Sequence, residues 1–160
     1  MPRRPASAAN DALLLDRQLC YALYAASLAM TKLYKPLLDP LNLTYPQYLV
    51  MLVLWEGDDR TVSELGERLA LDSGTLTPLL KRLQVQGLVA RQRDADDECR
   101  VRITLTVAGR ALRTRAATVP PQLLRASGCS LAKLTGLTRQ LHELRARINR
   151  LPSQAARSRP

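Results

Sequence analysis

The stretch TVSELGERLALDSGTLTPLLKRLQVQG, residues 61–87, decides the fold. Thr61 and Glu64 have the spacing of a capping box, which predicts the start of a short helix. Asp72 is a residue that often begins a helix and Gly87 is one that often follows the end of a helix, so a second helix is expected between them. Two short helices joined by a tight turn predict a helix-turn-helix.

The residue pattern changes directly after this stretch. Residues 88–93, LVARQR, and residues 99–105, CRVRITL, are strand candidates, and the acidic turn DADDE lies between them. In the second strand Val101, Ile103 and Leu105 alternate with polar residues, which is the two-residue period of a strand. A hairpin with one apolar edge and one basic edge, placed behind a helix-turn-helix, predicts a wing.

Two helices are expected before the helix-turn-helix. Residues 11–35 carry apolar side chains at helical spacing, and Pro36 and Pro40 limit how far this helix continues. Residues 44–57, TYPQYLVMLVLWEG, begin with a threonine suited to capping and end with a glycine. They are apolar on nearly every side, so this second helix is expected in the core.

Two more helices are expected behind the hairpin. Residues 106–119 form the first, which Pro120 and Pro121 break or kink, and residues from about 130 to 151 form the last. The predicted fold class is therefore mainly α with a small β-hairpin, a winged helix-turn-helix with a helical dimerisation domain.

The helices outside the winged helix-turn-helix each carry an apolar stripe. On a chain of 160 residues, such stripes are expected to bury each other across a twofold axis. The resulting homodimer would present two recognition helices to successive major grooves of a pseudo-palindromic operator. We expect the dimerisation region to comprise residues 11–45 and 107–151, the DNA-binding domain to comprise residues 46–106, and the ends, residues 1–10 and 152–160, to be disordered tails.

The charge of the chain favours a polyanionic partner. There are 24 Lys and Arg against 14 Asp and Glu, a formal net charge of +10, which suits nucleic acid or an anionic membrane surface. A recognition helix would present hydroxyls and threonine methyls to base edges, and the cations behind it and on the hairpin would reach phosphates or a minor groove. The alternative is a basic, solvated surface around an ordinary helical hairpin. The candidate DNA-binding residues are Ser73, Thr75, Thr77, Pro78, Lys81, Arg82, Arg91, Arg93, Arg100 and Arg102.

The cysteines and the single histidine argue against a disulfide framework and a zinc site. There are three cysteines and one histidine, and no two cysteines have Cys-x-x-Cys spacing. No metal or cofactor is therefore expected. The longest apolar run, around residues 48–55, is too short to span a bilayer, and the N-terminus has no signal-peptide pattern. We expect a soluble, cytoplasmic protein with reduced thiols and no membrane partner.

Cys20 lies in the apolar run LCYALY, residues 19–24, and has two interpretations. A cysteine in such a run is usually a small buried hydrophobe. Alternatively, nearby tyrosine hydroxyls that donate hydrogen bonds to the sulfur would favour its thiolate.

Four stretches of this chain resemble one known family. LDRQLCYALY, KLYKPLLDPLNLTYPQYLVMLVLWE, TVSELGERLALDSGTLTPLLKRLQVQGLV and ITLTVAGRAL are together similar to the OhrR branch of the MarR family, bacterial repressors that sense organic hydroperoxides through a cysteine. The resemblance implies that Cys20 is the peroxide-sensing cysteine. It also implies that Tyr34 and Tyr45 hydrogen-bond the sensing sulfur, that Tyr24 lines the pocket and that Cys129 is a resolving cysteine. Cys20 and Tyr34 are fourteen residues apart, which is about 21 Å along a straight helix, so the implied contact predicts a pocket shared between subunits. A bend in the helix is the competing explanation.

Two positions depart from the family pattern. The family's resolving cysteine falls where Arg125 stands, four residues before Cys129, so Cys129 would act from a shifted position or not at all. The wing motif of the family is Asp-Glu-Arg, and here it reads Asp97-Glu98-Cys99, followed by Arg100.

Three classes of function follow from these observations. The first is a homodimeric repressor that leaves its operator when an organic hydroperoxide oxidises Cys20 to a sulfenic acid, which then forms a disulfide with Cys129 of the other subunit or with a small thiol. The second is a MarR-type repressor that is released by a small phenolic or anionic ligand. The third is a thiol peroxidase that uses both cysteines, which the winged helix and the charge argue against, so we do not expect an enzyme.

Overall fold

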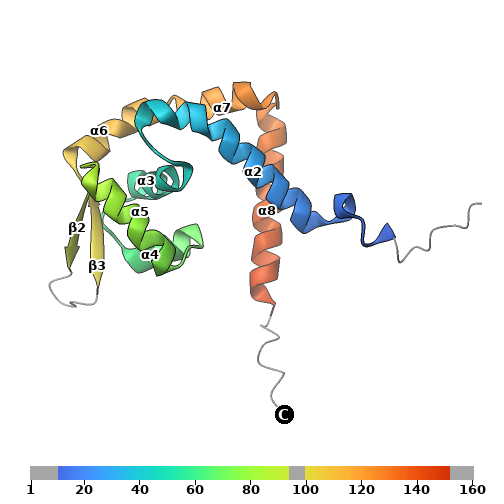
Figure 1. The fold of residues 1–160 in the computed structure, drawn as a ribbon, viewed down its shortest axis with the longest axis horizontal. Coiled ribbons are helices and arrows are strands. Elements are labelled where there is room, and N and C mark those ends of the chain that lie inside the picture. Colours follow the sequence, from blue (N-terminus) through green and yellow to red (C-terminus); the bar gives the residue numbers. More distant parts are fainter. Residues whose placement is uncertain (1–10, 94–99, 152–160) are drawn as a thin grey trace, which may run out of the picture. The chain divides into compact units, whose positions relative to one another are not determined.

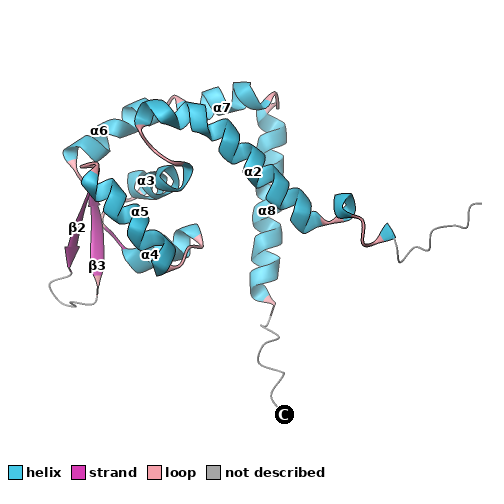
Figure 2. Ribbon diagram, in the orientation of Figure 1, coloured by secondary structure: helices cyan, strands magenta, loops and turns pink. Residues whose placement is uncertain are grey.

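The computed structural model describes residues 11–93 and 100–151, drawn as the coloured ribbon in Figure 1. The chain divides into two compact units, residues 1–120 and residues 121–160. The model is mainly helical with one small sheet (Figure 2), which confirms the predicted fold class. Along the described residues, no helix combines the length and the apolar character needed to cross a membrane.

The first unit opens with a long helix and the predicted core helix. A 3-10 turn, η1 (Leu15–Arg17), precedes α2 (Leu19–Leu38), and a second 3-10 turn, η2 (Asp39–Leu41), leads to α3 (Tyr45–Glu56). At the start of α3, the Thr44 side chain accepts a hydrogen bond from the Gln47 N–H, and the Gln47 side chain accepts one from the Thr44 N–H. Such a reciprocal cap satisfies two backbone donors that a helix start leaves unpaired.

The helix-turn-helix has the predicted caps. Thr61 and Glu64 form the capping box of α4 (Val62–Leu69), and Asp72 caps α5 (Ser73–Val85) by accepting a hydrogen bond from the Thr75 N–H. The turn between the helices contains Ala70 at a φ of 55°, a left-handed conformation that is costly for a residue with a Cβ. At the end of α5, Gly87 turns the chain at a φ of 72°.

The wing is an antiparallel sheet of three strands in the order β1, β3, β2. β2 (Val89–Arg93) pairs with β3 (Val101–Leu105), with Arg91 opposite Ile103. β1 (Arg60–Thr61) pairs with the other edge of β3. It was not predicted, because two residues are too few to show the alternation of apolar and polar side chains by which a strand is recognised. The acidic turn predicted at residues 94–98, and Cys99 after it, lie outside the described residues.

The core of the first unit joins α3 to the helix-turn-helix, the sheet and α6 (Val107–Ala116). Trp55 is 9% exposed, and its indole N–H donates a 2.9 Å hydrogen bond to the Gly109 carbonyl of α6. A Cβ on Gly109 would collide with the Leu88 carbonyl oxygen, so glycine lets α6 lie close against the start of β2. The fully buried side chains include Leu38, Val50, Met51, Leu54, Leu65, Leu76, Leu80, Leu83 and Ile103.

The prolines lie close to helix boundaries, as expected, but these boundaries differ from the predicted ones by a few residues. Pro36 lies inside α2, which continues to the buried Leu38, so the packing of its last turn offsets the backbone hydrogen bond that proline removes. The helix predicted from residue 106 is broken before Pro120 and Pro121, since α6 ends at Ala116. The two prolines lie in the first turn of a helix that was not predicted, α7 (Val119–Ser127). Proline is tolerated there because the first N–H groups of a helix have no partner inside the helix.

The second unit contains the rest of α7 and α8 (Leu131–Arg150), which confirms the predicted last helix. The Ser130 side chain caps α8 by accepting a hydrogen bond from the Lys133 N–H. No residue of α8 is buried, and its apolar stripe includes Leu137, Leu141 and Ile148, which are exposed. A helix with an uncovered apolar stripe of this kind needs a partner surface.

Candidate functional site

The exposed side of α5 carries the predicted base-reading residues. Leu76, Leu79, Leu80 and Leu83 bury the other side in the core. Ser73, Thr77 and Lys81 follow one another at intervals of four residues, which places them along one side of the helix. Ser73, Thr75, Pro78, Lys81 and Arg82 are exposed, and Thr77 is half-buried.

Hydrogen bonds within the helix fix the orientation of the Thr75 and Thr77 hydroxyls. The Thr75 hydroxyl donates to the Asp72 carboxylate at 3.0 Å, and the Thr77 hydroxyl donates to the Ser73 carbonyl at 2.8 Å. The hydrogen bonds from the Thr75 backbone and side chain lower the pKa of Asp72 from its usual value. Both hydroxyl oxygens can still accept a hydrogen bond, so the start of α5 has the geometry of a DNA-reading helix.

The wing arginines fall into two groups. Arg93 and Arg100 are exposed at the ends of the strands. Arg102 is held at the base of the sheet, where its guanidinium forms a 2.8 Å ion pair with Asp59 and also donates to the Asp59 carbonyl. Arg91 is half-buried, and its Nε atom is buried without a hydrogen-bond partner. The predicted role of these arginines at DNA stays a prediction, and the geometry favours Arg93 and Arg100 as the outer contacts.

Two acidic residues that the sequence did not single out fix the base of the wing. The Asp58 carboxylate accepts hydrogen bonds from the N–H groups of Asp59 and Leu105 and forms a 2.8 Å ion pair with Arg110. Burial raises the pKa of Asp58, but these hydrogen bonds and the Arg110 charge outweigh it and lower the pKa below its usual value. Hydrogen bonding to Arg102 lowers the pKa of Asp59. The signal in the sequence is an Asp-Asp pair at the glycine that ends α3.

The net positive charge of the chain arises outside the helix-turn-helix and the wing. Residues 107–160 contain eleven Lys and Arg and one acidic residue, Glu143, whereas residues 1–106 contain equal numbers of both charges. The net charge that suggested a polyanionic partner is thus carried by the α6–α8 region and the C-terminal end. The predicted contact of the winged helix-turn-helix with a polyanion must therefore depend on where its cations lie, because they do not outnumber its acidic residues.

Three tyrosines form a cluster between α2 and α3. The ring centroids of Tyr34 and Tyr45 are 4.7 Å apart, and those of Tyr34 and Tyr48 are 5.8 Å apart. Burial, with the neighbouring Tyr45 and Tyr48, raises the pKa of Tyr34 to about 12. The Tyr34 phenol therefore keeps its proton and remains a hydrogen-bond donor across the neutral range. Within the described part of the chain its hydroxyl has no hydrogen-bond partner.

Tyr48 also belongs to this cluster, although the family resemblance assigned it no role. It is 3% exposed, and its ring also meets Trp55, with 6.4 Å between centroids. Burial, with the neighbouring Tyr45, raises the pKa of Tyr48. Its spacing of three residues from Tyr45 on one helix was the signal that could have revealed it.

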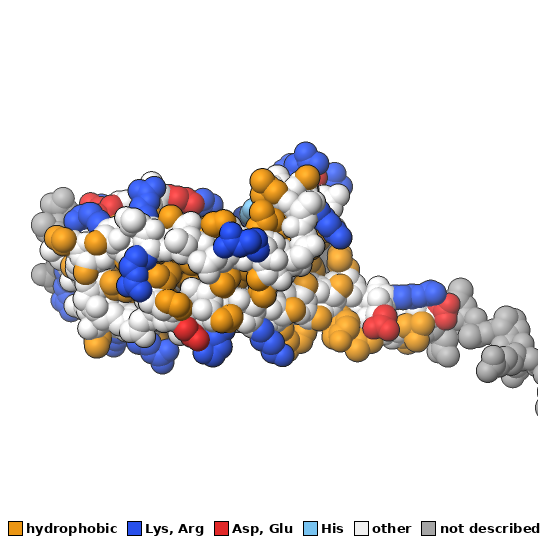
Figure 3. Space-filling model, turned by 90° about the horizontal axis from the view of Figure 1, so that it is seen from above, with side chains coloured by type: hydrophobic (Ala, Val, Ile, Leu, Met, Phe, Trp, Pro, Cys, Tyr) orange, Lys and Arg blue, Asp and Glu red, His pale blue; other side chains and the backbone are white. Residues whose placement is uncertain are grey.

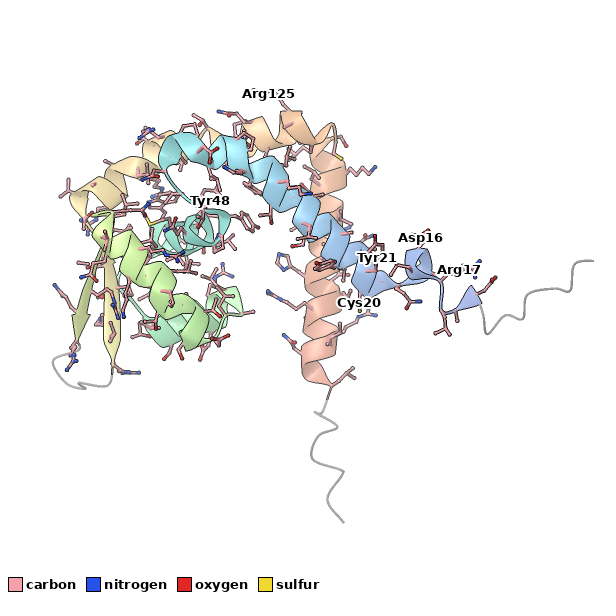
Figure 4. All side chains as sticks on the ribbon, in the orientation of Figure 1. Asp16, Arg17, Cys20, Tyr21, Tyr48 and Arg125 are labelled. Atoms are coloured by element: carbon pink, nitrogen blue, oxygen red, sulfur yellow. The ribbon has the colours of Figure 1, made fainter. Side chains whose placement is uncertain are left out.

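Cys20 lies apart from the tyrosine cluster. It is an exposed, free cysteine near the start of α2, whereas Tyr34 lies near the end of the same helix. Figure 4 shows Cys20 on α2 at a distance from Tyr48 on α3. Since one unbroken helix carries both residues, Cys20 and Tyr34 are about 21 Å apart along its axis. The prediction that they cannot meet within one chain is confirmed.

The surface around Cys20 is apolar and uncovered. Leu19 is 57% exposed, Tyr24 is 63% exposed and Leu28 is 47% exposed. In Figure 3, apolar side chains appear at the surface next to the grey N-terminal trace. Contiguous apolar surface on a helix marks an interaction site.

Cys129 is a free, half-buried cysteine between α7 and α8, in the second unit. Its backbone N–H donates to the Ser127 hydroxyl at 3.3 Å, directly after Gly128 turns the chain at a φ of 64°. Arg125, four residues earlier, is exposed on α7. The resolving role predicted for Cys129 stays a prediction.

Comparisons with known proteins give a consistent result. Residues 32–115 match the family model described as transcriptional regulator SarA/Rot. The chain is 51% identical over 134 residues to the organic hydroperoxide resistance transcriptional regulator of Bacillus subtilis, covering 84% of this chain and 91% of that protein. It is 48% identical over 144 residues to the HTH-type transcriptional regulator TtmR of Methylorubrum extorquens, covering 90% and 69% of the two chains.

A solved protein, AbfR of Staphylococcus epidermidis, has the same fold. Its crystal structure matches with a TM-score of 0.72 and 31% identity, over 89% of this chain and 99% of that one. The structure of reduced AbfR bound to DNA matches with a TM-score of 0.67 and 32% identity, over 86% and 96% of the two chains. The structure of disulfide-formed AbfR matches with a TM-score of 0.57 and 34% identity, over 85% and 96%.

Proposed function

Because this chain belongs to the OhrR branch of the MarR family of winged-helix transcriptional regulators, which are not enzymes, we propose that it is a homodimeric repressor released from operator DNA by oxidation of Cys20. The observation that carries the proposal is the separation of Cys20 from Tyr34 and Tyr45. A sulfur at one end of α2 and two phenol donors at the other end make a complete site only when a second copy of the chain supplies one half.

The chemistry of the shared site follows from its parts. The Tyr34 and Tyr45 hydroxyls of the partner subunit donate hydrogen bonds to the Cys20 sulfur, which favours the thiolate. The thiolate attacks the peroxide O–O bond, takes up one oxygen to become a sulfenic acid and releases the organic alcohol. The sulfenic acid then condenses with a thiol, losing water, to form a disulfide. Cys129 of the partner subunit is the proposed thiol, and a small cellular thiol is the alternative.

The effect on DNA follows from the two half-sites. A dimer binds tightly when both α5 helices engage successive major grooves together. A disulfide that pulls on α2 changes the spacing of the two helices, so one half-site is lost. Support comes from AbfR, because the structure of its reduced form bound to DNA and the structure of its disulfide-formed state both share this fold.

The test uses a DNA duplex selected from a random pool by the reduced protein. Wild type and Cys20→Ser are titrated onto this duplex before and after one equivalent of cumene hydroperoxide, and the products are run on a non-reducing gel. The proposal expects release of wild type only, with a covalent dimer that is lost in Cys129→Ser. If the peroxide leaves wild type bound, the proposal is wrong.

The second candidate is a repressor released by a small phenolic or anionic ligand. The observation that favours it is a hollow of 320 Å³ at the end of α2, lined by Lys32, Lys35, Asp39, Tyr45, two threonines and three apolar residues. Salicylate titrated onto the DNA complex would then release wild type and Cys20→Ser equally.

A further inference from the structure

Two glutamine side chains join the tyrosine cluster to the recognition helix. Gln47, in the first turn of α3, is 3% exposed, and its amide donates a 3.4 Å hydrogen bond to the side-chain oxygen of Gln86, directly after α5. The Gln86 amide donates a 2.9 Å hydrogen bond to the Asn42 carbonyl in the loop between α2 and α3. We call Gln47, Gln86 and the Asn42 carbonyl the glutamine bridge.

Helix capping alone does not account for the bridge. The cap of α3 uses only the Gln47 side-chain oxygen, a role that glutamate also fills in capping boxes. The Gln47 amide group is left over from the cap and must find another acceptor because it is buried. The end of α5 is turned by Gly87, so the Gln86 side chain is not needed there either. Both side chains are thus used to link two elements that lie 39 residues apart in sequence.

The glutamine bridge connects the tyrosine cluster of the proposed sensing site to the cationic side of the recognition helix α5. Tyr45 is the first residue of α3, between Thr44 and Gln47, and its ring lies on Tyr34. At the other end, Arg82 and Lys81 precede Gln86 by about one turn of α5 and are candidate phosphate contacts. A shift of Tyr45 therefore moves the cap of α3, and the bridge passes this movement to the cationic side of α5.

The surroundings of the bridge leave room for movement. A groove of 490 Å³ lies between the α2–α3 loop and the end of α5, lined by Asn42, Thr44, Gln47, Lys81, Arg82 and Gln86 among others. Tightly packed contacts resist sliding, whereas an open groove crossed by two hydrogen bonds can take up a second arrangement.

We infer that Gln47 and Gln86 are positioning residues that set the orientation of α5 according to the state of the tyrosine cluster. This inference rests on the proposed redox switch. Neither residue is a candidate for contact with peroxide or base edges, so both act through Tyr45 on one side and through Lys81 and Arg82 on the other. Breaking the bridge should leave reduced protein able to bind DNA but weaken the effect of Cys20 oxidation on that binding.

The experiment cuts the bridge in two places. Gln47→Glu keeps the acceptor that caps α3 and replaces the amide donor to Gln86 with a second, negatively charged oxygen. Gln86→Ala removes both hydrogen bonds of that side chain. Gln84→Ala is the matched control, because Gln84 is an exposed glutamine on the same helix. For each protein, affinity for the selected duplex is measured before and after one equivalent of cumene hydroperoxide, with mass spectrometry to verify equal oxidation of Cys20. The expected result is that the ratio of reduced to oxidised affinity falls about fivefold or more in both bridge variants and is unchanged in Gln84→Ala.

Two results would overturn the inference while leaving the proposed function intact. In one, wild type is released by peroxide and the bridge variants are released to the same extent. In the other, the reduced and oxidised affinities fall in parallel with the thermal unfolding midpoint, which indicates a purely structural role. If wild type itself is not released, the proposed function fails, and the inference fails with it.

Discussion

Leu54 and Leu28 lie on neighbouring helices of the same unit and have opposite surroundings. Leu54 on α3 is 1% exposed in the core, whereas Leu28 on α2 is 47% exposed among other uncovered apolar side chains. The winged helix-turn-helix therefore completes its own core, but the first half of α2 does not. Under the proposed function, the fold is thus completed within one chain, whereas sensing by Cys20, which lies in the incomplete region, needs two chains.

The largest expected effect comes from a substitution on the uncovered apolar surface in the first half of α2. Leu28→Glu should shift the proposed dimer to monomer, because each dimer carries the change twice and loses about 1 kcal/mol of apolar burial per half-exposed leucine, about 2 kcal/mol in all. Burying a carboxylate at each site costs several kcal/mol more. Sedimentation velocity over a range of concentrations measures the shift. Val85→Glu is the control, since Val85 is 88% exposed on α5 and should leave the dimer intact. Sedimentation of Leu28→Glu as a dimer at wild-type concentrations would contradict the comparison.

The next largest effect comes from a substitution in the buried core of the winged helix-turn-helix. Leu54→Ala should lower the free energy of unfolding by about 3 kcal/mol, because it opens a cavity in a closely packed core. Urea denaturation followed by circular dichroism measures the loss. A loss below about 1 kcal/mol would mean that the site collapses around the smaller side chain or is less well packed than its exposure indicates.

A smaller effect concerns the base of the wing. Asp58→Asn should cost about 1 kcal/mol at pH 6, because the amide keeps an acceptor for the Leu105 N–H but loses the ion pair with Arg110. The pKa of Asp58 is lowered in the folded state from an ordinary value of 3.8. The carboxylate therefore stabilises the fold above pH 3.8, and this contribution is lost as the pH falls through the lowered value. Urea titrations at several pH values should show the difference between wild type and variant shrinking below pH 3.8.

The smallest effect should be stabilising. Ala70→Gly should raise the free energy of unfolding by about 0.5 kcal/mol, because glycine removes the strain of a positive φ but adds freedom to the unfolded chain. Ala111→Gly, in the middle of α6, should instead lower it by about 1 kcal/mol. Thermal unfolding of the two variants tests whether they move in opposite directions.

Local signals in the sequence predicted most of the fold. The caps at Thr44, Thr61 and Asp72 were predicted correctly because each depends on residues within one turn. Pro36 and α7 were misjudged because packing, and the position of proline within a first turn, decide whether a helix tolerates it. β1 was missed because it exists only by pairing with β3.

The candidate site was predicted in part for the same reason. The distance between Cys20 and Tyr34 could be calculated because one helix carries both residues. Other contacts join segments that are far apart in the sequence, namely the ring contact of Tyr34 with Tyr48 and the ion pair of Asp59 with Arg102. The spacing of residues in the sequence does not reveal such contacts, so Arg102 was predicted to bind DNA together with the other arginines of the wing.

Trp55 is the single tryptophan of the chain and lies between the ring of Tyr48 and the Gly109 carbonyl. Indole emission therefore comes from one buried place, where the tyrosine cluster meets the start of α6. A movement that opens the hydrogen bond to Gly109 hydrates the indole and shifts its emission to the red. The protein thus contains its own optical probe, and the passage of a signal from α3 to α6 can be timed in a stopped-flow fluorimeter without attaching a dye.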